Sequence, residues 1–326
     1  MWIAGDIGGT KAHLALFEYQ DEKLVMVQEH LYKSQEFKNV ESLLKDFIKK
    51  TKAKNITSCT LGIAGPVVKG IVKTPNLPWI VDRNVLQKET NIENVHLLND
   101  LEAVGYGIFE LDAQDVHFLT ENKIMQEANC AVIAAGTGLG EACIYFDGKD
   151  YKPFATEGGH SDFAPRNEEQ MEYLQFMQKR FDHVSYERVL SGAGLVSCFE
   201  FFVEKDHANV SFELQERMSK EGGAKVISEL AQSSQNAYCE RALNFFVRIY
   251  GQKAGNMALS FFATGGVYIV GGIAPKIVDA LKQEVFMEGF LQKGRMEELL
   301  AKIPVVIVLN ENAALLGAAH YAKRFV

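Results

Sequence analysis

The sequence feature that most constrains the fold is a glycine-rich turn near the start of the chain, Gly5-Asp6-Ile7-Gly8-Gly9-Thr10. It separates two apolar runs, residues 1–4 and 14–17, so the pattern predicts a strand, a tight turn and a second strand. Adjacent glycines allow unusual backbone conformations and let an anion approach the amide groups closely, which favours a phosphate-binding loop. Asp6 would then lie where Mg²⁺ or its bound water can sit. A plain glycine hairpin with a hydrogen-bonded Asp6 is the alternative that this segment alone leaves open.

A second loop of the same kind lies further along the chain. The apolar run 131–135 leads into Gly136-Thr137-Gly138-Leu139-Gly140, and residues 142–146 follow as the partner strand. Because the arrangement of strand, Gly/Thr turn and strand occurs twice, a shared purpose is favoured over two unrelated turns. A third segment, 266–272, reads as a strand that ends in the pair Gly271-Gly272. This pair leaves room for a ligand, or it marks a tightly packed turn from strand to helix.

Hydrophobic periodicity predicts the other elements. Further strands are expected at 24–32, 56–63, 95–98 and 305–309, and helices at 40–50, 85–89, 101–109, 168–180, 233–262, 275–281 and 312–324, with another ending near 202. The first three strands should form an antiparallel meander. Asn99 and Asp100 directly follow the strand at 95–98, the end at which side chains of open α/β folds point into clefts. Asp100 is therefore a candidate general base, unless it merely caps the helix that follows.

Composition limits the class of protein. The chain has 326 residues, which suits about two domains, with 47% hydrophobic and 23% charged residues. A formal net charge of −8 argues against a general nucleic-acid binder. The 5 cysteines are too widely spaced for a metal site or a disulfide framework, so we expect buried thiols in a reducing compartment. We see no signal peptide and no apolar run long enough to span a membrane, so we expect a cytoplasmic protein without a membrane partner.

These pieces resemble the superfamily of sugar kinases, actin and chaperone ATPases, and within it the bacterial glucokinases over nearly the whole chain. The matching segments occur in the family's order: Gly5-Asp6-Ile7-Gly8-Gly9-Thr10, Leu98-Asn99-Asp100, Gly136-Thr137-Gly138-Leu139-Gly140, Glu157-Gly158-Gly159-His160, Tyr186-Glu187-Arg188-Val189-Leu190-Ser191-Gly192 and Ile269-Val270-Gly271-Gly272-Ile273. Each segment alone is weak evidence for the family, whereas the ordered set is strong evidence for it. Taken alone, His160 would more often be a structural histidine and Glu187 a surface ion pair.

The resemblance implies ATP-dependent phosphorylation of D-glucose at O6, with Asp100 as the general base. Sugar-binding residues implied by the family are Asn99, Asp100, Glu157, His160 and Glu187, with Asn76 and Gly65 as further candidates. Nucleotide-binding residues implied by it are Gly5, Asp6, Ile7, Gly8, Gly9, Thr10, Gly136, Thr137, Gly138, Gly271 and Gly272. The implied cofactors are ATP and Mg²⁺, the latter held mainly by ATP oxygens and water with Asp6 nearby.

One departure from the glucokinase pattern lies after the first loop. Close relatives of the proteobacterial enzymes tend to have Asn-Ala-Arg there, whereas this chain has Lys11-Ala12-His13. That lysine and Thr74-Pro75-Asn76-Leu77-Pro78 resemble the related repressor and kinase group instead, whose members usually carry zinc-binding cysteines beside the sugar-site histidine. The cysteines nearest His160 in sequence are Cys143 and Cys198, so we expect a zinc-free kinase. The contacts of Lys11 and His13 stay unassigned.

The resemblance also implies a two-lobed α/β fold of the actin-like ATPase (ribonuclease H-like) type, each lobe a mixed sheet with flanking helices. We expect a small lobe of residues 1–108 plus 312–326, a large lobe of residues 109–311, and a homodimer. The alternatives are a kinase for another hexose or an N-acetylhexosamine, and a non-catalytic sugar sensor. Asp100 and both phosphate loops disfavour the sensor. A chaperone-type ATPase is disfavoured because no room is left for a separate peptide-binding domain.

Overall fold

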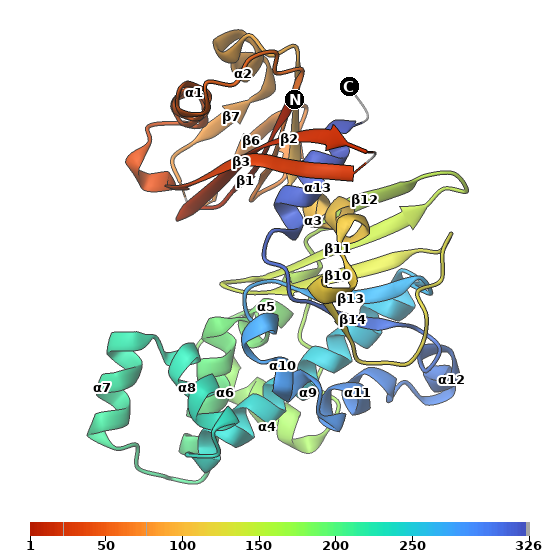
Figure 1. Cartoon of the computed structure of the whole chain (residues 1–326). Helices are drawn as coiled ribbons and strands as arrows, with labels where there is room; N and C mark the ends of the chain where they lie inside the picture. Colours follow the sequence, from red (N-terminus) through yellow and green to blue (C-terminus); the bar gives the residue numbers. More distant parts are fainter. Residues whose placement is uncertain (22, 76, 324–326) are drawn as a thin grey trace. The chain divides into compact units, whose positions relative to one another are not determined.

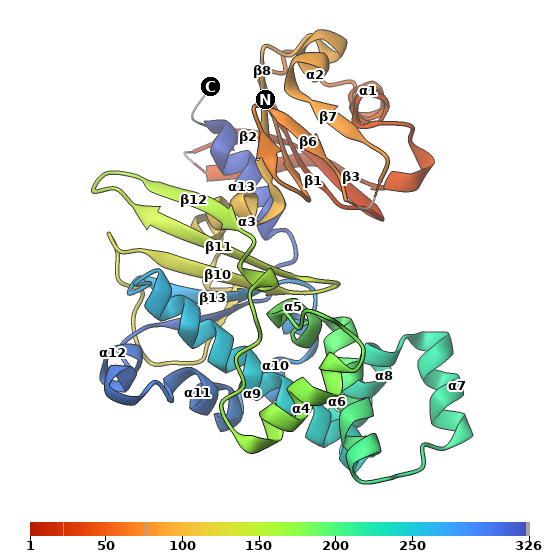
Figure 2. The ribbon, with the colours of Figure 1, turned by 180° about the vertical axis from the view of Figure 1, so that it is seen from behind.

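The computed structural model describes residues 1–21, 23–75 and 77–323, which divide into two compact units. The first unit comprises Met1–Gln114, Pro153–Ala155 and the described residues from Asn310 onward, and the second comprises Asp115–Lys152 and Thr156–Leu309. Each unit combines a sheet with flanking helices (Figures 1 and 2). The predicted α/β class is therefore confirmed.

The first unit is built on a five-stranded sheet in the order β3-β2-β1-β4-β8. Its strands are β1 (Trp2–Ile7), β2 (Lys11–Gln20), β3 (Lys23–Lys33), β4 (Ser58–Ile63) and β8 (Asn94–Asn99). The first three form the predicted antiparallel meander, whereas β4 runs parallel to β1 and to β8. In this register Asp6 lies opposite Gly62, and Ile63 lies opposite Asn99. The carboxyl ends of three neighbouring strands therefore meet at one edge of the sheet.

Helices cover both faces of this sheet. They are α1 (Val40–Thr51), α2 (Arg83–Thr90), α3 (Asp100–Gly107) and α13 (Ala313–Ala322), and a small sheet of β5 (Val67–Val68), β6 (Ile71–Lys73) and β7 (Ile80–Asp82) completes the unit. Alternate residues of β1 face opposite ways, as a strand requires. Ile3 packs in one cluster with Leu43 of α1, and Trp2 packs in another with Ala318 of α13.

Helices α3 and α13 approach each other closely through two glycines. A Cβ atom added to Gly107 would lie 1.9 Å from the carbonyl oxygen of Ala313, and one added to Gly317 would lie 1.7 Å from that of Ala103. Only glycine fits such contacts. The contact fixes α3, and with it the position of Asp100, the first residue of the helix.

The second unit is built on a six-stranded sheet in the order β12-β11-β10-β13-β14-β9. The strands of this sheet are β9 (Val116–Phe118), β10 (Cys130–Ala135), β11 (Leu139–Phe146), β12 (Tyr151–Thr156), β13 (Gly266–Val270) and β14 (Val305–Val308). The middle of the edge strand β12, Pro153–Ala155, is grouped with the first unit. Strand β10 pairs antiparallel with β11 and parallel with β13, which runs parallel to β14. The unit thus repeats the strand, turn and strand plan of the first, as the two loops predict.

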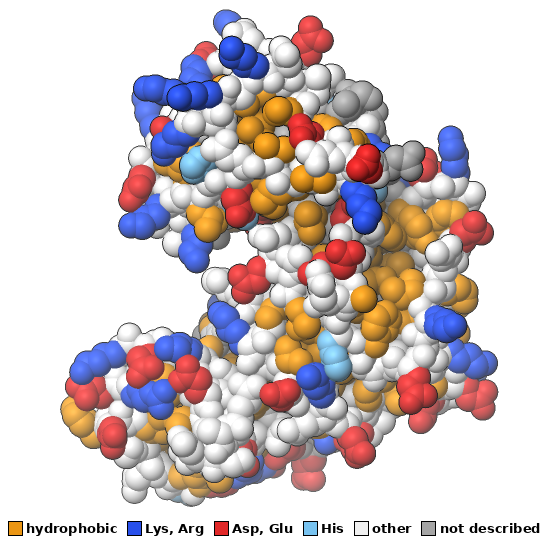
Figure 3. Space-filling model, viewed as in Figure 1, with side chains coloured by type: hydrophobic (Ala, Val, Ile, Leu, Met, Phe, Trp, Pro, Cys, Tyr) orange, Lys and Arg blue, Asp and Glu red, His pale blue; other side chains and the backbone are white. Residues whose placement is uncertain are grey.

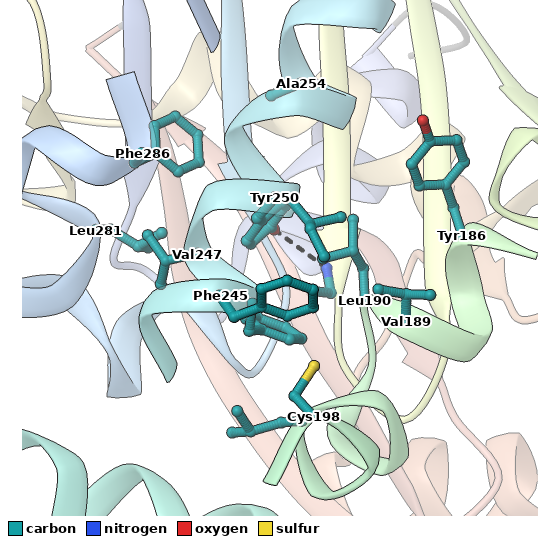
Figure 4. Packing of buried hydrophobic residues seen from close by; sticks show 14 of the residues in the cluster. Tyr186, Val189, Leu190, Cys198, Phe245, Val247, Tyr250, Ala254, Leu281 and Phe286 are labelled. Atoms are coloured by element: carbon teal, nitrogen blue, oxygen red, sulfur yellow. Dashed lines mark hydrogen bonds between the residues drawn. The ribbon is translucent and has the colours of Figure 1, made fainter. Parts of the chain in front are cut away.

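The helices of the second unit surround α9 (Ala237–Ser260), most of whose residues from Cys239 to Ala258 are buried. The others are α4 (Glu168–Gln178), α5 (Tyr186–Val189), α6 (Gly192–Lys205), α7 (Phe212–Glu221), α8 (Gly223–Gln232), α10 (Val278–Leu281), α11 (Glu284–Leu291) and α12 (Glu297–Leu300). Phe245, Val247 and Tyr250 of α9 lie among the buried side chains in Figure 4, where the backbone N–H of Ala135 donates to the Tyr250 hydroxyl at 3.3 Å. The long helix therefore lies in the core of this unit.

Short 3₁₀ helices occur at Ser34–Glu36, Ile108–Glu110, Ala113–Asp115, Gly158–His160, Ala274–Lys276 and Gly294–Met296. The helix predicted at 233–262 begins only at Ala237, because the Asn236 side chain caps it by accepting from the N–H groups of Tyr238 and Cys239. The helix predicted at 275–281 is split into a 3₁₀ turn and α10. All five cysteines are buried and unpaired, as predicted.

Helix α7 was not predicted from the sequence. It has no buried residue, so it lacks the strong apolar stripe that reveals a helix. Figure 3 shows basic and acidic side chains side by side over this part of the unit, where Arg217 pairs with Glu221 and with Glu229 of α8. Among the described residues, no helix combines the length and apolar character needed to cross a membrane.

Candidate functional site

The first glycine loop is a tight connection between β1 and β2. The N–H of Gly8 donates to the carbonyl oxygen of Lys11 at 2.9 Å. Ser34, a buried residue just after β3, holds the loop from the other side: its hydroxyl donates to the oxygen of Gly8 at 2.7 Å and its N–H to the oxygen of Thr10 at 3.0 Å. The sequence carried no signal for this brace, because Ser34 lies far from the loop along the chain.

Asp6 and Asp100 lie close enough to influence each other's charge. Burial, and then the negative charge of Asp100, raise the pKa of Asp6 to about 6, while His13 has the opposite effect. His13 stands opposite Asp6 on β2, and its Nε2 lies 2.6 Å from Oε2 of Glu29. The structure therefore brings the two predicted acidic residues together and gives His13 a place beside them.

Asn99, rather than Asp100, is the N-cap of α3. The N–H of Leu101 donates to Oδ1 of Asn99 at 2.9 Å and to Oδ1 of Asp100 at 3.0 Å. The side-chain amide of Asn99 also donates to the oxygen of Gly65 at 3.1 Å. Asp100 lies in the first turn of the helix, where the helix dipole stabilises negative charge.

Gly65 occupies a position that only glycine tolerates well. Its φ is +113°, and an added Cβ atom would lie 3.1 Å from the oxygen of Lys73 and 3.5 Å from the ring of Pro75. The predicted residues Gly65 and Asn99 are thus brought together beside the proline-containing loop. Asn76, the other candidate from that loop, lies outside the described residues.

The second glycine loop is fixed to Glu187. The N–H of Leu139 donates to Oε2 of Glu187 at 3.0 Å, and an added Cβ atom on Gly138 would lie 2.5 Å from the same oxygen. The loop is closed by a hydrogen bond from the N–H of Gly136 to the oxygen of Gly138, and Gly192 donates to the oxygen of Gly136. A carboxylate predicted to bind sugar therefore also orients a predicted phosphate loop.

Glu157, His160 and Glu187 gather around the 3₁₀ turn at Gly158–His160. Nδ1 of His160 lies 3.8 Å from Oε1 of Glu187, and its Nε2 lies 3.8 Å from Oε2 of Glu157. An open pocket of about 380 Å³ is lined by His160 and Glu187 together with Arg180, Phe181, Asp182, His183, Ser185 and Arg188. This is a volume typical of small-molecule sites, and its polar lining suits a hydroxylated ligand.

Gly271 and Gly272 lie beside the second loop. Gly271 has φ +87° and would place a Cβ atom 2.7 Å from the oxygen of Ala135, and the N–H of Ile273 donates to that oxygen at 3.1 Å. The two glycines differ in their surroundings. Gly271 is a tightly packed turn residue, whereas an added Cβ atom at Gly272 meets no atom within 4 Å, and the same is true of Gly136. The open space at these two positions fits a bound nucleotide.

One sequence-based reason for the glycines was wrong. The described glycines with positive φ do not include Gly8, Gly136 or Gly138, so unusual backbone conformation does not explain them. Close approach explains Gly138, which meets Glu187, and Gly8, whose added Cβ atom would lie 3.1 Å from the oxygen of Lys11. Gly8 and Gly138 are therefore explained by their small size rather than by left-handed backbone geometry.

Within residues 1–21, 23–75 and 77–323, no group of three or more His, Cys, Asp and Glu side chains is arranged to hold a metal ion. A Mg²⁺ ion carried by a nucleotide needs fewer protein ligands, since nucleotide oxygens and water fill most of its coordination sphere. Mg²⁺ prefers oxygen ligands, and the carboxylate of Asp6, which lies near that of Asp100, would offer oxygens to such an ion or to its bound water. The residues at this edge of the sheet therefore fit such an ion.

Comparison with known proteins decides the family. A family model described as Glucokinase matches residues 3–325. The chain belongs to the glucokinase family. A curated glucokinase from Nostoc punctiforme is 39% identical, and the alignment covers 99% of this chain and 98% of that protein. A curated glucokinase from Yersinia pestis is 34% identical over 99% of this chain and 96% of its own length.

Solved glucokinase structures share the fold. A glucokinase from an Antarctic psychrotroph matches with a TM-score of 0.87 and 27% identity, covering 99% of this chain and 98% of that one. A glucokinase of the ROK family from Streptomyces griseus, solved with glucose and AMPPNP, matches with a TM-score of 0.65 and 18% identity over 99% of both chains. The predicted two-lobed actin-like fold type and the hexokinase-type phosphotransferase class are thereby confirmed.

Proposed function

We propose that this glucokinase-family chain transfers the γ-phosphoryl group of ATP to O6 of D-glucose, giving glucose 6-phosphate and ADP. The observation that carries the proposal is the match of the glucokinase family model to residues 3–325. The Streptomyces griseus relative, whose structure holds glucose and an ATP analogue, supports the choice of both substrates. Phosphoryl transfer needs in-line positioning, neutralisation of phosphate charge and a group that accepts the hydroxyl proton.

Asp100 is the proposed general base. A carboxylate in hydrogen-bond reach of the O6 hydroxyl accepts its proton as the oxygen attacks the γ-phosphorus. Its position at the carboxyl edge of the sheet, at the start of α3, supports this role. The hydrogen bonds around Leu101 hold the carboxylate and the Asn99 side chain in place, so that the base is oriented before substrate binds.

The proposed sugar ligands are Asn99, Glu157, His160 and Glu187, with Gly65 and Asn76 lining the site. Carboxylates and amides can each hold two neighbouring hydroxyl groups, and a site of this kind rejects sugars that leave its polar groups unpaired. Because Oε2 of Glu187 already accepts from Leu139, its Oε1 is the oxygen offered to the sugar. Glucose binding at Glu187 would then steady the second phosphate loop as well.

The proposed phosphate ligands are the backbone N–H groups of the two glycine loops, residues 5–10 and 136–138, with Gly271 and Gly272 beside the adenosine. The open space at Gly136 and Gly272 supports this assignment. Mg²⁺ neutralises phosphate charge when bound, and Asp6 would hold it through water. The site needs no zinc in this proposal.

Three further features belong to the proposal. The lobes 1–108 plus 312–326 and 109–311 are the domains that we propose for the chain. The resemblance to glucokinases supports a homodimer. The same resemblance, together with five free buried cysteines, supports a cytoplasmic protein.

The test is the release of ADP from Mg-ATP with glucose, mannose, fructose, N-acetylglucosamine, 2-deoxyglucose or no sugar. We expect strong turnover with glucose, weak turnover with the other sugars and almost none without sugar. Preferred turnover of another hexose or an N-acetyl sugar would overturn the glucose assignment and keep the kinase. If no sugar stimulates turnover, the kinase proposal is wrong and a sugar sensor is the better account.

A further inference from the structure

A buried ion pair that the proposed chemistry does not use lies beneath the sugar-binding turn of the second unit. Nζ of Lys253 on α9 lies 2.9 Å from Oε1 of Glu141 on β11, and only 8% and 3% of the two side chains are exposed. Burial raises the pKa of Glu141, and Lys253 counteracts this effect. Glu141 stands two residues after Leu139, whose N–H is held by Glu187.

Lys253 also contacts both segments of the second unit that carry proposed sugar ligands. Its ammonium group donates to the oxygen of Gly158 at 3.2 Å and to the hydroxyl of Ser161 at 3.4 Å. It lies 4.5 Å from the centre of the Tyr186 ring, which is within reach of a cation–π interaction. One side chain thus touches the turn that carries Glu157 and His160, the residue before Glu187, and the strand that leaves the second phosphate loop.

A neighbouring polar residue of α9, Asn256, supports the segment at Tyr186. The amide of Asn256 donates to the Tyr186 hydroxyl at 3.2 Å, and Lys293 donates to Oδ1 of Asn256 at 2.6 Å. Figure 4 shows the Tyr186 hydroxyl pointing away from Val189 and Leu190 of the hydrophobic cluster. The N–H of Tyr186 also donates to the oxygen of Ser161, which ties the two segments together.

Stability alone does not explain this arrangement. A buried ion pair costs so much desolvation that apolar residues of similar volume often serve a core equally well. What apolar residues cannot supply is a charged donor that fixes the carbonyl of Gly158. An added Cβ atom on Gly158 would lie 2.3 Å from Oε2 of Glu141, so the turn rests directly on the pair.

We infer that Lys253, paired with Glu141, is a positioning residue that fixes the turn at Gly158–His160 and the segment at Tyr186 against β11, and thereby sets the affinity for the sugar. This inference rests on the proposed function. Residues that orient metal ligands typically change metal affinity or activity about 10–100-fold when they are removed, and we expect an effect of the same order for a residue that orients sugar ligands.

The test compares the double variant Glu141→Gln/Lys253→Met with the wild type. It removes both charges together, so that no buried charge is left unpaired. We expect KM for glucose to rise about tenfold or more, while KM for ATP changes less than about threefold. Lys253→Arg, which keeps the charged donor, should stay close to the wild-type KM for glucose. A merely structural pair would change the melting temperature without this split between the two substrates.

The matched control is Arg248→Met/Glu288→Gln, which neutralises an exposed ion pair between α9 and α11. It should leave both KM values unchanged. Should the buried double variant fail to fold, Ser161→Ala keeps both charges and removes one partner of Lys253; it should raise KM for glucose by a smaller factor. The inference is overturned if the double variant folds and its KM for glucose is unchanged. If Ser161→Ala has to be used instead, an unchanged KM for glucose in that variant overturns it. Wild-type turnover of glucose tests the proposed function separately.

Discussion

At the scale of single residues, several side chains with a proposed chemical role also make a structural contact. Glu187 holds the N–H of Leu139 and faces His160 with its other oxygen. Asn99 caps α3 with its oxygen and reaches Gly65 with its amide. Such double use explains why the local sequence around these residues reads equally well as a cap or an ion pair.

The role of Asp100 is tested by Asp100→Asn. The amide oxygen can still accept from the N–H of Leu101, so the helix start and the melting temperature should be preserved. Loss of the general base should lower kcat by about 10²–10⁴-fold, with a much smaller change in KM for glucose. Steady-state kinetics and thermal melting check both parts; a kcat within a few fold of the wild type would remove Asp100 from the mechanism.

The charge on Asp6 should cost stability. Its pKa rises from 3.8 to about 6 on folding, so the folded state binds the proton more tightly than the unfolded state does. The contribution of Asp6 to the free energy of unfolding is therefore fully present below about pH 4 and is lost as the pH rises through about 6. Asp6→Asn should therefore raise the free energy of unfolding at pH 7 by up to about 3 kcal/mol and leave it nearly unchanged at pH 4.

Chemical denaturation at the two pH values checks this prediction. The same variant should lose turnover, because the proposed Mg²⁺ partner is gone; this is the trade of stability for activity that is common at functional sites. Equal stability of the variant and the wild type at pH 7 would show that Asp6 carries no unfavourable charge in the fold.

At the scale of elements, strand ends and close helix contacts determine where the candidate site residues lie. The register of β1, β4 and β8 places Asp6 and Asn99 at one sheet edge. The contact of α3 with α13, made by Gly107 and Gly317, sets the helix that begins with Asp100.

Gly317→Ala tests this contact. The added methyl group would lie 1.7 Å from the oxygen of Ala103, and backbone has to move to make room. We expect the free energy of unfolding to fall by about 1–3 kcal/mol. We also expect kcat to fall, because α3 shifts. Gly136→Ala is the control for stability: its methyl group meets open space, so the melting temperature should hold while KM for ATP rises. An unchanged melting temperature in Gly317→Ala would show that the helices separate freely.

The sequence predicted most elements of the fold and the loops, because periodic apolar runs and glycine turns are local signals. Helix α7 was missed because it buries no residue. Ser34, Glu141 and Lys253 were missed for another reason: each acts on a segment that is distant along the chain, and no local pattern announces such a contact. A loop can be recognised from its local sequence, whereas the distant residue that holds it in place is found only from the structure.

At the scale of the whole molecule, the chain combines the segments expected of a sugar kinase in the family's order. Two glycine loops, a carboxylate at a sheet edge, a polar turn and a glycine pair after β13 occur in one chain that the glucokinase family model matches over residues 3–325. We propose that these parts together phosphorylate glucose at O6, with Asp100 as the general base.

The most direct test measures ADP and glucose 6-phosphate together, from Mg-ATP and glucose, for the wild type and for Asp100→Asn. We expect equal amounts of both products for the wild type and little of either for the variant. ADP without glucose 6-phosphate, or equal rates for the two proteins, would contradict the proposal.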